Sequence, residues 1–144
     1  MNVRIKNVGT CPFPKYETAG AAGMDVRANI ESSIDLAPGE RLLIPTGLYL
    51  EMPDGIECQV RPRSGLALKN GITVLNTPGT IDSDYRGEIG VILINHSTSN
   101  FTIEPKERIG QLVFCPIVRV NLILSDSISD SERGSGGFGS TGKT

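Results

Sequence analysis

Two carboxylates, a tyrosine and an arginine lie close together between residues 76 and 88. Asp82 and Asp84 are two positions apart, so on a regular strand their side chains share one face. Such a pair of carboxylates can hold a metal ion. In a simpler alternative one aspartate acts on a water molecule while the other stays solvated, because an oriented water needs only modest help from a weak base.

Turn-forming residues flank these groups and predict how they are held. Residues 76–79 contain asparagine, proline and glycine, and a second turn at residues 84–87 leads into the apolar run 89–94. Proline restricts φ and glycine accepts positive φ, so we expect a β-hairpin or a tight β-arch. A short, stiff turn can present a binding or catalytic group, although a solvated hairpin tip without function is an equally good interpretation.

A second group of residues has the composition of a phosphate site. Arg63 and Ser64 precede a short predicted helix at residues 64–70. We expect Ser64 to cap this helix, whose free N–H groups and partial positive charge suit an anion, and Arg63 adds charge-assisted hydrogen bonds. A capped helix with a surface arginine is the competing interpretation.

Two further stretches carry weaker signals. Residues 19–24 form a glycine-rich turn before Asp25, which begins a predicted strand, and this pattern favours a structural role. Gln111 precedes a strongly apolar strand, where its amide can orient a water or an oxyanion. A plain surface hairpin at residues 105–112 explains that second stretch slightly better.

The segment 125–144 is rich in serine, glycine and aspartate and has a single aromatic residue, Phe138. Residues 137–144 match the phosphate-binding pattern GxxxxGK[ST], but that motif needs a strand before it and a helix after it, and neither is predicted. Consecutive glycine and serine N–H groups can still wrap a polyphosphate, with Arg133 adding charge and Phe138 stacking on a base. Because such a segment cannot order by itself, we expect a lid that closes over a ligand.

The rest of the chain must supply strands to position these groups. Strand-like runs separated by glycine and proline lie at residues 41–52, 56–60, 88–94 and 109–124. No amphipathic helical period of 10–15 residues recurs, so the pattern predicts an all-β domain, either an antiparallel barrel or a two-sheet jelly roll, rather than a parallel α/β sheet. We expect one domain over residues 1–124 and a flexible arm over residues 125–144.

Composition excludes several functional classes. The net charge of −2, the absence of tryptophan and an aromatic content of 5% argue against a nucleic-acid-binding protein. Three cysteines without CxxC spacing argue against a disulfide framework or a zinc site and suit a reducing cytoplasm. No apolar run is long enough to cross a membrane. We therefore expect a cytoplasmic protein.

Taken in order, the five stretches resemble the five motifs of the homotrimeric dUTP pyrophosphatases (dUTPases). The matching segments are Ala22-Gly-Met-Asp-Val26, Pro62-Arg-Ser-Gly-Leu-Ala67, residues 76–88, Arg108-Ile-Gly-Gln111 and residues 133–142. A clear departure is Gly110, which stands where many members carry alanine and is expected to loosen the strand before Gln111.

The resemblance implies a jelly-roll β-barrel subunit in a homotrimer, with active sites assembled at the subunit interfaces. It implies hydrolysis of dUTP to dUMP and pyrophosphate, with Mg²⁺ held by the triphosphate. This reaction supplies dUMP for thymidylate synthesis and keeps uracil out of DNA. Neither a nucleic acid nor a membrane is an implied partner.

The resemblance also assigns roles to the turn residues. Asp82 is implied as the base that activates the attacking water and as a partner of the deoxyribose 3′-OH. Tyr85 packs against the sugar and leaves no room for a 2′-OH. Asn76 and the backbone of Thr80 and Ile81 read the uracil edge, and groups left unpaired by a wrong base make such a site selective.

The remaining implied roles concern the phosphates. Arg63, Ser64, Gly65 and Gln111 hold the phosphates and the developing negative charge, which makes Gln111 a catalytic residue as well. Asp25 contacts Mg²⁺ indirectly, through a metal-bound water.

In the tail, Arg133 is implied to bind the γ-phosphate and Phe138 to cover the uracil, while Gly139 and Ser140 complete the substrate contacts. Two alternatives stay open: a dCTP deaminase, which shares the fold, and a catalytically idle, dUTPase-like regulatory protein.

Overall fold

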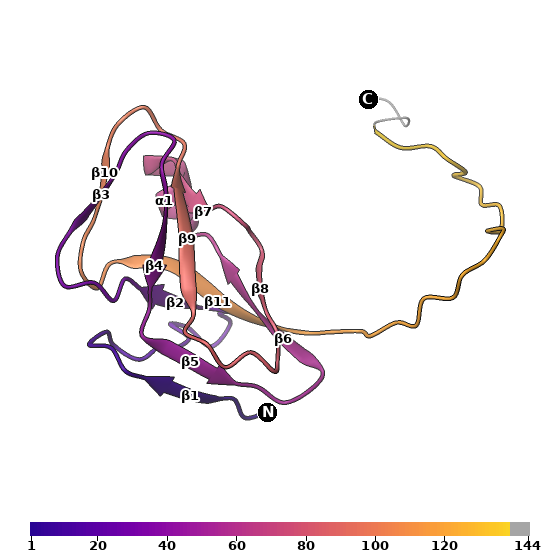
Figure 1. Ribbon diagram of the computed structural model, residues 1–144, viewed down its shortest axis with the longest axis horizontal. Coiled ribbons are helices and arrows are strands. Elements are labelled where there is room, and N and C mark those ends of the chain that lie inside the picture. Colours follow the sequence, from indigo (N-terminus) through magenta and orange to yellow (C-terminus); the bar gives the residue numbers. More distant parts are fainter. Residues whose placement is uncertain (139–144) are drawn as a thin grey trace.

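The computed structural model describes residues 1–138, and its regular secondary structure is almost entirely antiparallel β-strand (Figure 1). One sheet has four strands in the order β2-β11-β6-β8. Their bounds are β2 Gly23–Arg27, β11 Arg108–Pro116, β6 Ile56–Arg61 and β8 Gly79–Ile81. This four-stranded sheet carries residues of the first, third and fourth motif segments, and the second segment, residues 62–67, follows directly after β6.

A three-stranded sheet in the order β4-β9-β7 and two isolated strand pairs complete the body of the molecule. The three-stranded sheet consists of β4 Arg41–Pro45, β9 Gly90–Asn95 and β7 Ile72–Val74. The pairs are β1 Arg4–Asn7 with β5 Leu48–Glu51, and β3 Ile34–Leu36 with β10 Phe101–Ile103. The predicted all-β architecture is therefore confirmed.

Alternating side chains explain where the core lies. Along β6, Ile56, Cys58 and Val60 are buried while the residues between them face outward, as the sequence predicts. Val91 and Leu93 of β9 are fully buried in the same cluster. Burial of each large aliphatic side chain stabilises the fold by roughly 1.5–3 kcal/mol, so these positions hold the sheets together and leave the outward positions free for polar groups.

The short helix α1, Ser64–Asn70, begins one residue earlier than the predicted cap implies, because a cap at Ser64 would make Gly65 the first helical residue. Arg63 is the N-cap, in extended conformation, and Ser64 is the first helical residue. No side chain caps this end. The prediction that Ser64 caps the helix is therefore wrong, because the cap position belongs to Arg63, whose guanidinium is bonded elsewhere.

Strand β11 ends earlier than the apolar run 109–124 suggested. Its strand pairing stops at Pro116, and one further backbone bond, from Ile117 N to Gly55 O at 3.0 Å, continues its path. Residues 118–135 are exposed, and Figure 1 shows the tail running away from the body as a long extended segment. The second half of the run is apolar, and from Val118 onward it forms no strand pairing with any of the described residues.

Candidate active site

One row of polar side chains crosses the outward face of the four-stranded sheet. Asp25 on β2 lies opposite Gln111 on β11, and Gln111 lies opposite Arg61 on β6. Antiparallel register therefore brings the first and fourth motif segments side by side, although they are more than eighty residues apart in sequence. Arg63 follows the end of β6 by two residues and joins this group.

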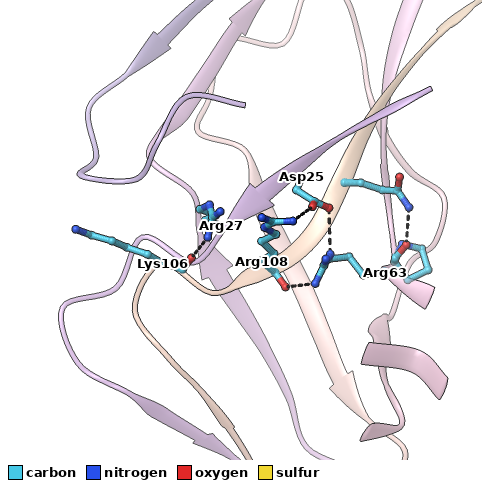
Figure 2. A network of polar contacts seen from close by, with 7 residues as sticks. Asp25, Arg27, Arg63, Lys106 and Arg108 are labelled. Carbon is cyan, nitrogen blue, oxygen red and sulfur yellow. Dashed lines mark hydrogen bonds and ion pairs between the residues drawn. The ribbon is translucent and has the colours of Figure 1, made fainter. Parts of the chain in front are cut away.

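Asp25 is held between two arginines (Figure 2). Its Oδ1 accepts a bond from Arg63 Nε at 3.0 Å, and its Oδ2 accepts one from Arg108 Nη1 at 3.1 Å. The Asp25 side chain is 23% exposed and that of Arg63 is 31% exposed, so both charges are partly shielded from water. One carboxylate between two guanidiniums leaves an excess positive charge, which suits an anionic ligand.

The Gln111 amide fixes the chain just before Arg63. Its Nε2 donates to Pro62 O at 3.0 Å. The amide lies so close to Gly23 that a Cβ built there would stand 2.3 Å from Gln111 Oε1. A side chain at position 23 would therefore displace the Gln111 amide, and the glycine leaves room for the bond to Pro62, which precedes the segment that carries Arg63 and Ser64.

The segment between β8 and β9 is a β-arch rather than a hydrogen-bonded hairpin. β8 pairs with β6, whereas β9 pairs with β4 and β7 in the other sheet. Tyr85 N donates to Asp82 O at 3.1 Å and closes a tight turn. At the far end, Glu88 accepts a bond from Gly47 N at 2.8 Å. The arch is thus anchored at both ends and presents its side chains on a stiff backbone.

Residues of the same arch hold the Tyr85 side chain in place. Its hydroxyl donates to Glu88 O at 3.1 Å, while the ring lies over Gly87, where a Cβ would stand 2.2 Å from the Tyr85 oxygen. Thr80, Ile81, Asp82 and Tyr85 line a cavity of about 370 Å³ together with side chains of β4 and β9. The structure thus brings four of the five predicted turn residues together around one hollow.

The other two groups on this segment are placed differently. Asn76 is exposed, and its Nδ2 would be 3.1 Å from a Cβ at Gly79, so the glycine lets the amide approach the start of β8. Asp84 does not line the main cavity but a second one of about 260 Å³, which Asp82 also borders. Within residues 1–138 no group of three or more potential metal ligands is found, so a metal site at Asp82 and Asp84 gains no support.

The phosphate-site candidates and the arch lie at opposite ends of the four-stranded sheet. β8 runs antiparallel to β6, with Cys58 opposite Ile81, so Asp82 continues toward the Glu57 end. Arg63 follows the other end of β6, beyond Arg61. The four residue-to-residue steps from Glu57 to Arg61 correspond to about 13 Å of strand at ~3.3 Å per step. A single chain therefore does not bring Asp82 to Arg63.

The tail residues are separate from both groups. Arg133 Nε donates to Gly136 O at 2.8 Å within the tail, and Phe138 is fully exposed. Gly139 and Ser140 lie outside the described residues. Ser64 and Gly65 are exposed at the start of α1, beside Arg63. Arg108 is a site residue that the sequence reasoning did not single out, although it stands in the fourth motif segment.

The chain is similar to known proteins over most of its length. A family model described as dUTPase matches residues 10–142. A deoxyuridine 5'-triphosphate nucleotidohydrolase of Chlamydia pneumoniae is 64% identical over 131 residues, which cover 90% of either chain. One of Fusobacterium nucleatum subsp. nucleatum is 60% identical over 131 residues, covering 91% of this chain and 90% of that protein.

A solved structure supports the fold over nearly the full length. The dUTPase of Staphylococcus bacteriophage 80alpha, in its structure with dUPNHPP, is 26% identical and superposes with a TM-score of 0.89 over 98% of each chain. The match includes the segment that leaves the body as a tail. Family model, relatives and fold together establish that this chain belongs to the dUTPase family.

Proposed function

We propose that this protein hydrolyses dUTP to dUMP and pyrophosphate. The observation that carries the proposal is the family match from residue 10 to residue 142, with relatives at 60–64% identity that are named for this reaction. The match spans all five motif segments, and the proposal is further supported by the position of the first four, which lie on the four-stranded sheet or directly adjoin it.

Asp82 is the proposed base. It is exposed and borders the cavity of about 370 Å³, so a water and a phosphorus centre can both reach it. An aspartate that takes a proton from an oriented water contributes typically 10²–10⁴ in rate. The water attacks the α-phosphorus, and pyrophosphate leaves.

Tyr85 and the start of β8 supply the proposed specificity. The Tyr85 ring forms one wall of the same cavity and is held by Gly87 and Glu88, so it packs on deoxyribose and excludes a 2′-OH. Asn76 and the backbone of Thr80 and Ile81 pair with the uracil edge. A wrong base leaves these groups unpaired, which costs affinity.

The phosphates bind to the group around Asp25. Arg63, Ser64 and Gly65 lie at the beginning of α1, and Gln111 holds the preceding carbonyl. The excess positive charge of the two arginines attracts the triphosphate and stabilises charge that develops in the transition state.

The geometry around Asp25 fits Mg²⁺ only as a metal carried by the phosphates. Both carboxylate oxygens already accept bonds from arginines, and a site with excess positive charge does not suit direct coordination of a bare cation. Each oxygen keeps a lone pair that can accept a hydrogen from a metal-bound water. Bound in this way, Mg²⁺ would neutralise part of the triphosphate charge.

The separation of Asp82 and Arg63 supports a site shared between copies of the chain, and the family resemblance makes a homotrimer the proposed assembly. If Asp82 of one copy meets Arg63 of another, the two halves of the site come together without bending the sheet. The outward face of the three-stranded sheet carries Leu43, Ile92 and Ile94, of which Leu43 is 67% exposed, and such a face suits contact with another copy. We propose that residues 1–124 form the subunit body and that the arm 125–144 closes over a site of the assembly.

Separate incubations with dUTP, dCTP, dTTP and UTP in the presence of Mg²⁺ test the reaction, with pyrophosphate and ammonia as readouts. We expect pyrophosphate from dUTP alone. Ammonia from dCTP would move the protein to the deaminase branch, and no product from any nucleotide would favour a regulatory protein. Among residues 1–138, no helix has the length and hydropathy of a membrane-spanning segment.

A further inference from the structure

We infer that Arg108 is a positioning residue of the phosphate site, acting through Asp25 on Arg63. Arg108 Nη1 and Arg63 Nε donate to different oxygens of the same carboxylate, at 3.1 and 3.0 Å. This inference rests on the proposed function, because it takes Arg63 as a residue that binds the phosphates. Arg108 would then act on the phosphate site through protein groups, Asp25 and Arg63, rather than by binding the phosphates itself.

An irregularity in β11 places Arg108 on the correct face. Regular pairing from Gln111 opposite Asp25 would put Ile109 opposite Arg27, but the register shifts and Arg108 takes that position. As a result Ile109 and Gly110 are both buried, and Arg108 lies on the face that carries Asp25. β-bulges beside active sites commonly re-aim one side chain in this way.

Arg108 restrains Arg63 by two routes. Its side chain binds the Asp25 oxygen that Arg63 does not use, which fixes the plane of the carboxylate and with it the direction of the Arg63 Nε bond. Its backbone carbonyl accepts a second bond from Arg63 Nη1 at 3.4 Å. With Nε and Nη1 occupied, the Arg63 Nη2 group is the part of the fork left for a phosphate oxygen.

Partial burial makes the side-chain route effective. The side chains of Arg63, Asp25 and Arg108 are 31%, 23% and 40% exposed, so the contacts are less screened than a surface pair. Without Arg108, Asp25 would face Arg63 alone and draw the guanidinium toward itself. The arginine would then meet the triphosphate in the wrong orientation.

Arg27 supplies a matched control. It lies opposite Arg108 across the two strands, and its Nη1 donates to Lys106 O at 2.7 Å (Figure 2). Arg27→Gln therefore removes a positive charge from the same edge of the sheet without touching Asp25. Any effect of net charge alone should appear equally in Arg27→Gln and Arg108→Gln.

The test measures dissociation constants of a non-hydrolysable dUTP analogue and of dUMP, using full-length protein in a double-mutant cycle. We expect Arg108→Gln to weaken the analogue about tenfold and dUMP less than twofold, because a hydrogen bond between charged groups governs the outer phosphates. In the Asp25→Asn background the same substitution should add less than about twofold. Arg108→Lys, which keeps the charge, should recover part of the loss, and Arg27→Gln should bind as wild type.

Two outcomes would overturn the inference. Additive losses in the Asp25→Asn background would show that Arg108 does not act through Asp25. Equal weakening of the analogue and dUMP, with a reduced number of sites per chain, would show a general structural defect. If the wild type hydrolyses dUTP while either result holds, only this inference fails; if the wild type binds neither nucleotide and makes no product, the proposed function fails with it.

Discussion

Within one chain, Asp82 lies beside the Glu57 end of strand β6, whereas Arg63 lies beyond the Arg61 end of the same strand. The candidate base and the candidate phosphate-binding arginine are therefore kept apart by the same sheet that positions each of them. Sites built on rigid strands are precise, but strands also fix separations that side chains cannot span.

Asp82→Asn should abolish turnover and leave binding intact. The amide keeps the shape and the hydrogen-bonding reach of the carboxylate but cannot accept a proton from water. We expect kcat to fall by about 10²–10⁴ while the dissociation constant of a non-hydrolysable dUTP analogue stays within about threefold, since uniform binding is retained. Asp84→Asn, two residues away and outside the main cavity, is the matched control; turnover retained in Asp82→Asn would remove Asp82 as the base.

Gly87→Ala should weaken discrimination against ribonucleotides. A Cβ at Gly87 would stand 2.2 Å from the Tyr85 oxygen, so the Tyr85 ring must move away from its position over residue 87. We expect the ratio of kcat/KM for dUTP to that for UTP to fall about tenfold, which is the order of effect for one misplaced packing contact. Gly20→Ala adds a Cβ where nothing lies within 4 Å and serves as control. An unchanged ratio in Gly87→Ala would mean that Tyr85 does not sense the sugar from this position.

Gly23→Ala and Gly110→Ala should have opposite outcomes. At Gly23 the new Cβ meets Gln111 Oε1 at 2.3 Å, so the bond to Pro62 O is lost and activity should fall about tenfold or more, as expected when a site residue moves.

At Gly110 the nearest atom is 3.4 Å away and φ is not positive, so alanine fits. We expect unchanged kcat and a gain of about 0.4–1 kcal/mol in urea unfolding. A destabilised Gly110→Ala protein would contradict this packing argument.

Truncation after Ser131 should preserve assembly and abolish most activity. The removed residues include Arg133 and Phe138, and the described part of that segment forms no hydrogen bond with the body. Its loss should leave the melting temperature unchanged, since no core contact is removed. Sizing chromatography and the dUTP assay check the two halves of the prediction, and full activity of the truncated protein would exclude a lid role.

Stability should fall at alkaline pH because of Cys58. Burial raises the pKa of its thiol from 9.0 to about 12. Between these values the folded protein keeps a proton that the unfolded chain releases, so the free energy of unfolding decreases as pH rises above 9. The expected loss is roughly 1.4 kcal/mol from pH 8 to pH 10, measured by urea unfolding. Cys58→Ala should unfold with a smaller difference between the two pH values; an identical pH dependence would assign the effect to other groups.

Local patterns in the sequence predicted much of the architecture. The alternation of Ile56, Cys58 and Val60 identifies β6 and its buried face, because side chains on a strand alternate between two sides. The short helix at Ser64–Asn70 also follows from its local composition. The all-β class follows from frequent turn residues between short apolar runs.

Long-range pairing accounts for what local patterns missed. Asp25 and Arg108 meet only because β2 and β11 pair in one particular register, and the shift at Ile109 that turns Arg108 outward leaves no local signal. Whether residues 82–89 form a hairpin or an arch depends on which sheet each strand joins. Ser64 resembles a helix cap, but the extended backbone of Arg63 sets the helix start one residue earlier. The clustering of motif residues came from family resemblance, since their roles depend on contacts that no single stretch contains.

Among residues 1–138, the bond from Ile117 N to Gly55 O is the last backbone hydrogen bond that ties the C-terminal segment to the rest of the body. A tethered segment samples the volume around its anchor, at an effective concentration that reaches millimolar values for short flexible links. The same segment supplied as a free peptide would have to reach that concentration to occupy a site equally often. If the arm closes as the proposed lid, the covalent link would allow an arm with weak intrinsic affinity to close repeatedly and still release product, so that fast exchange and high occupancy are compatible.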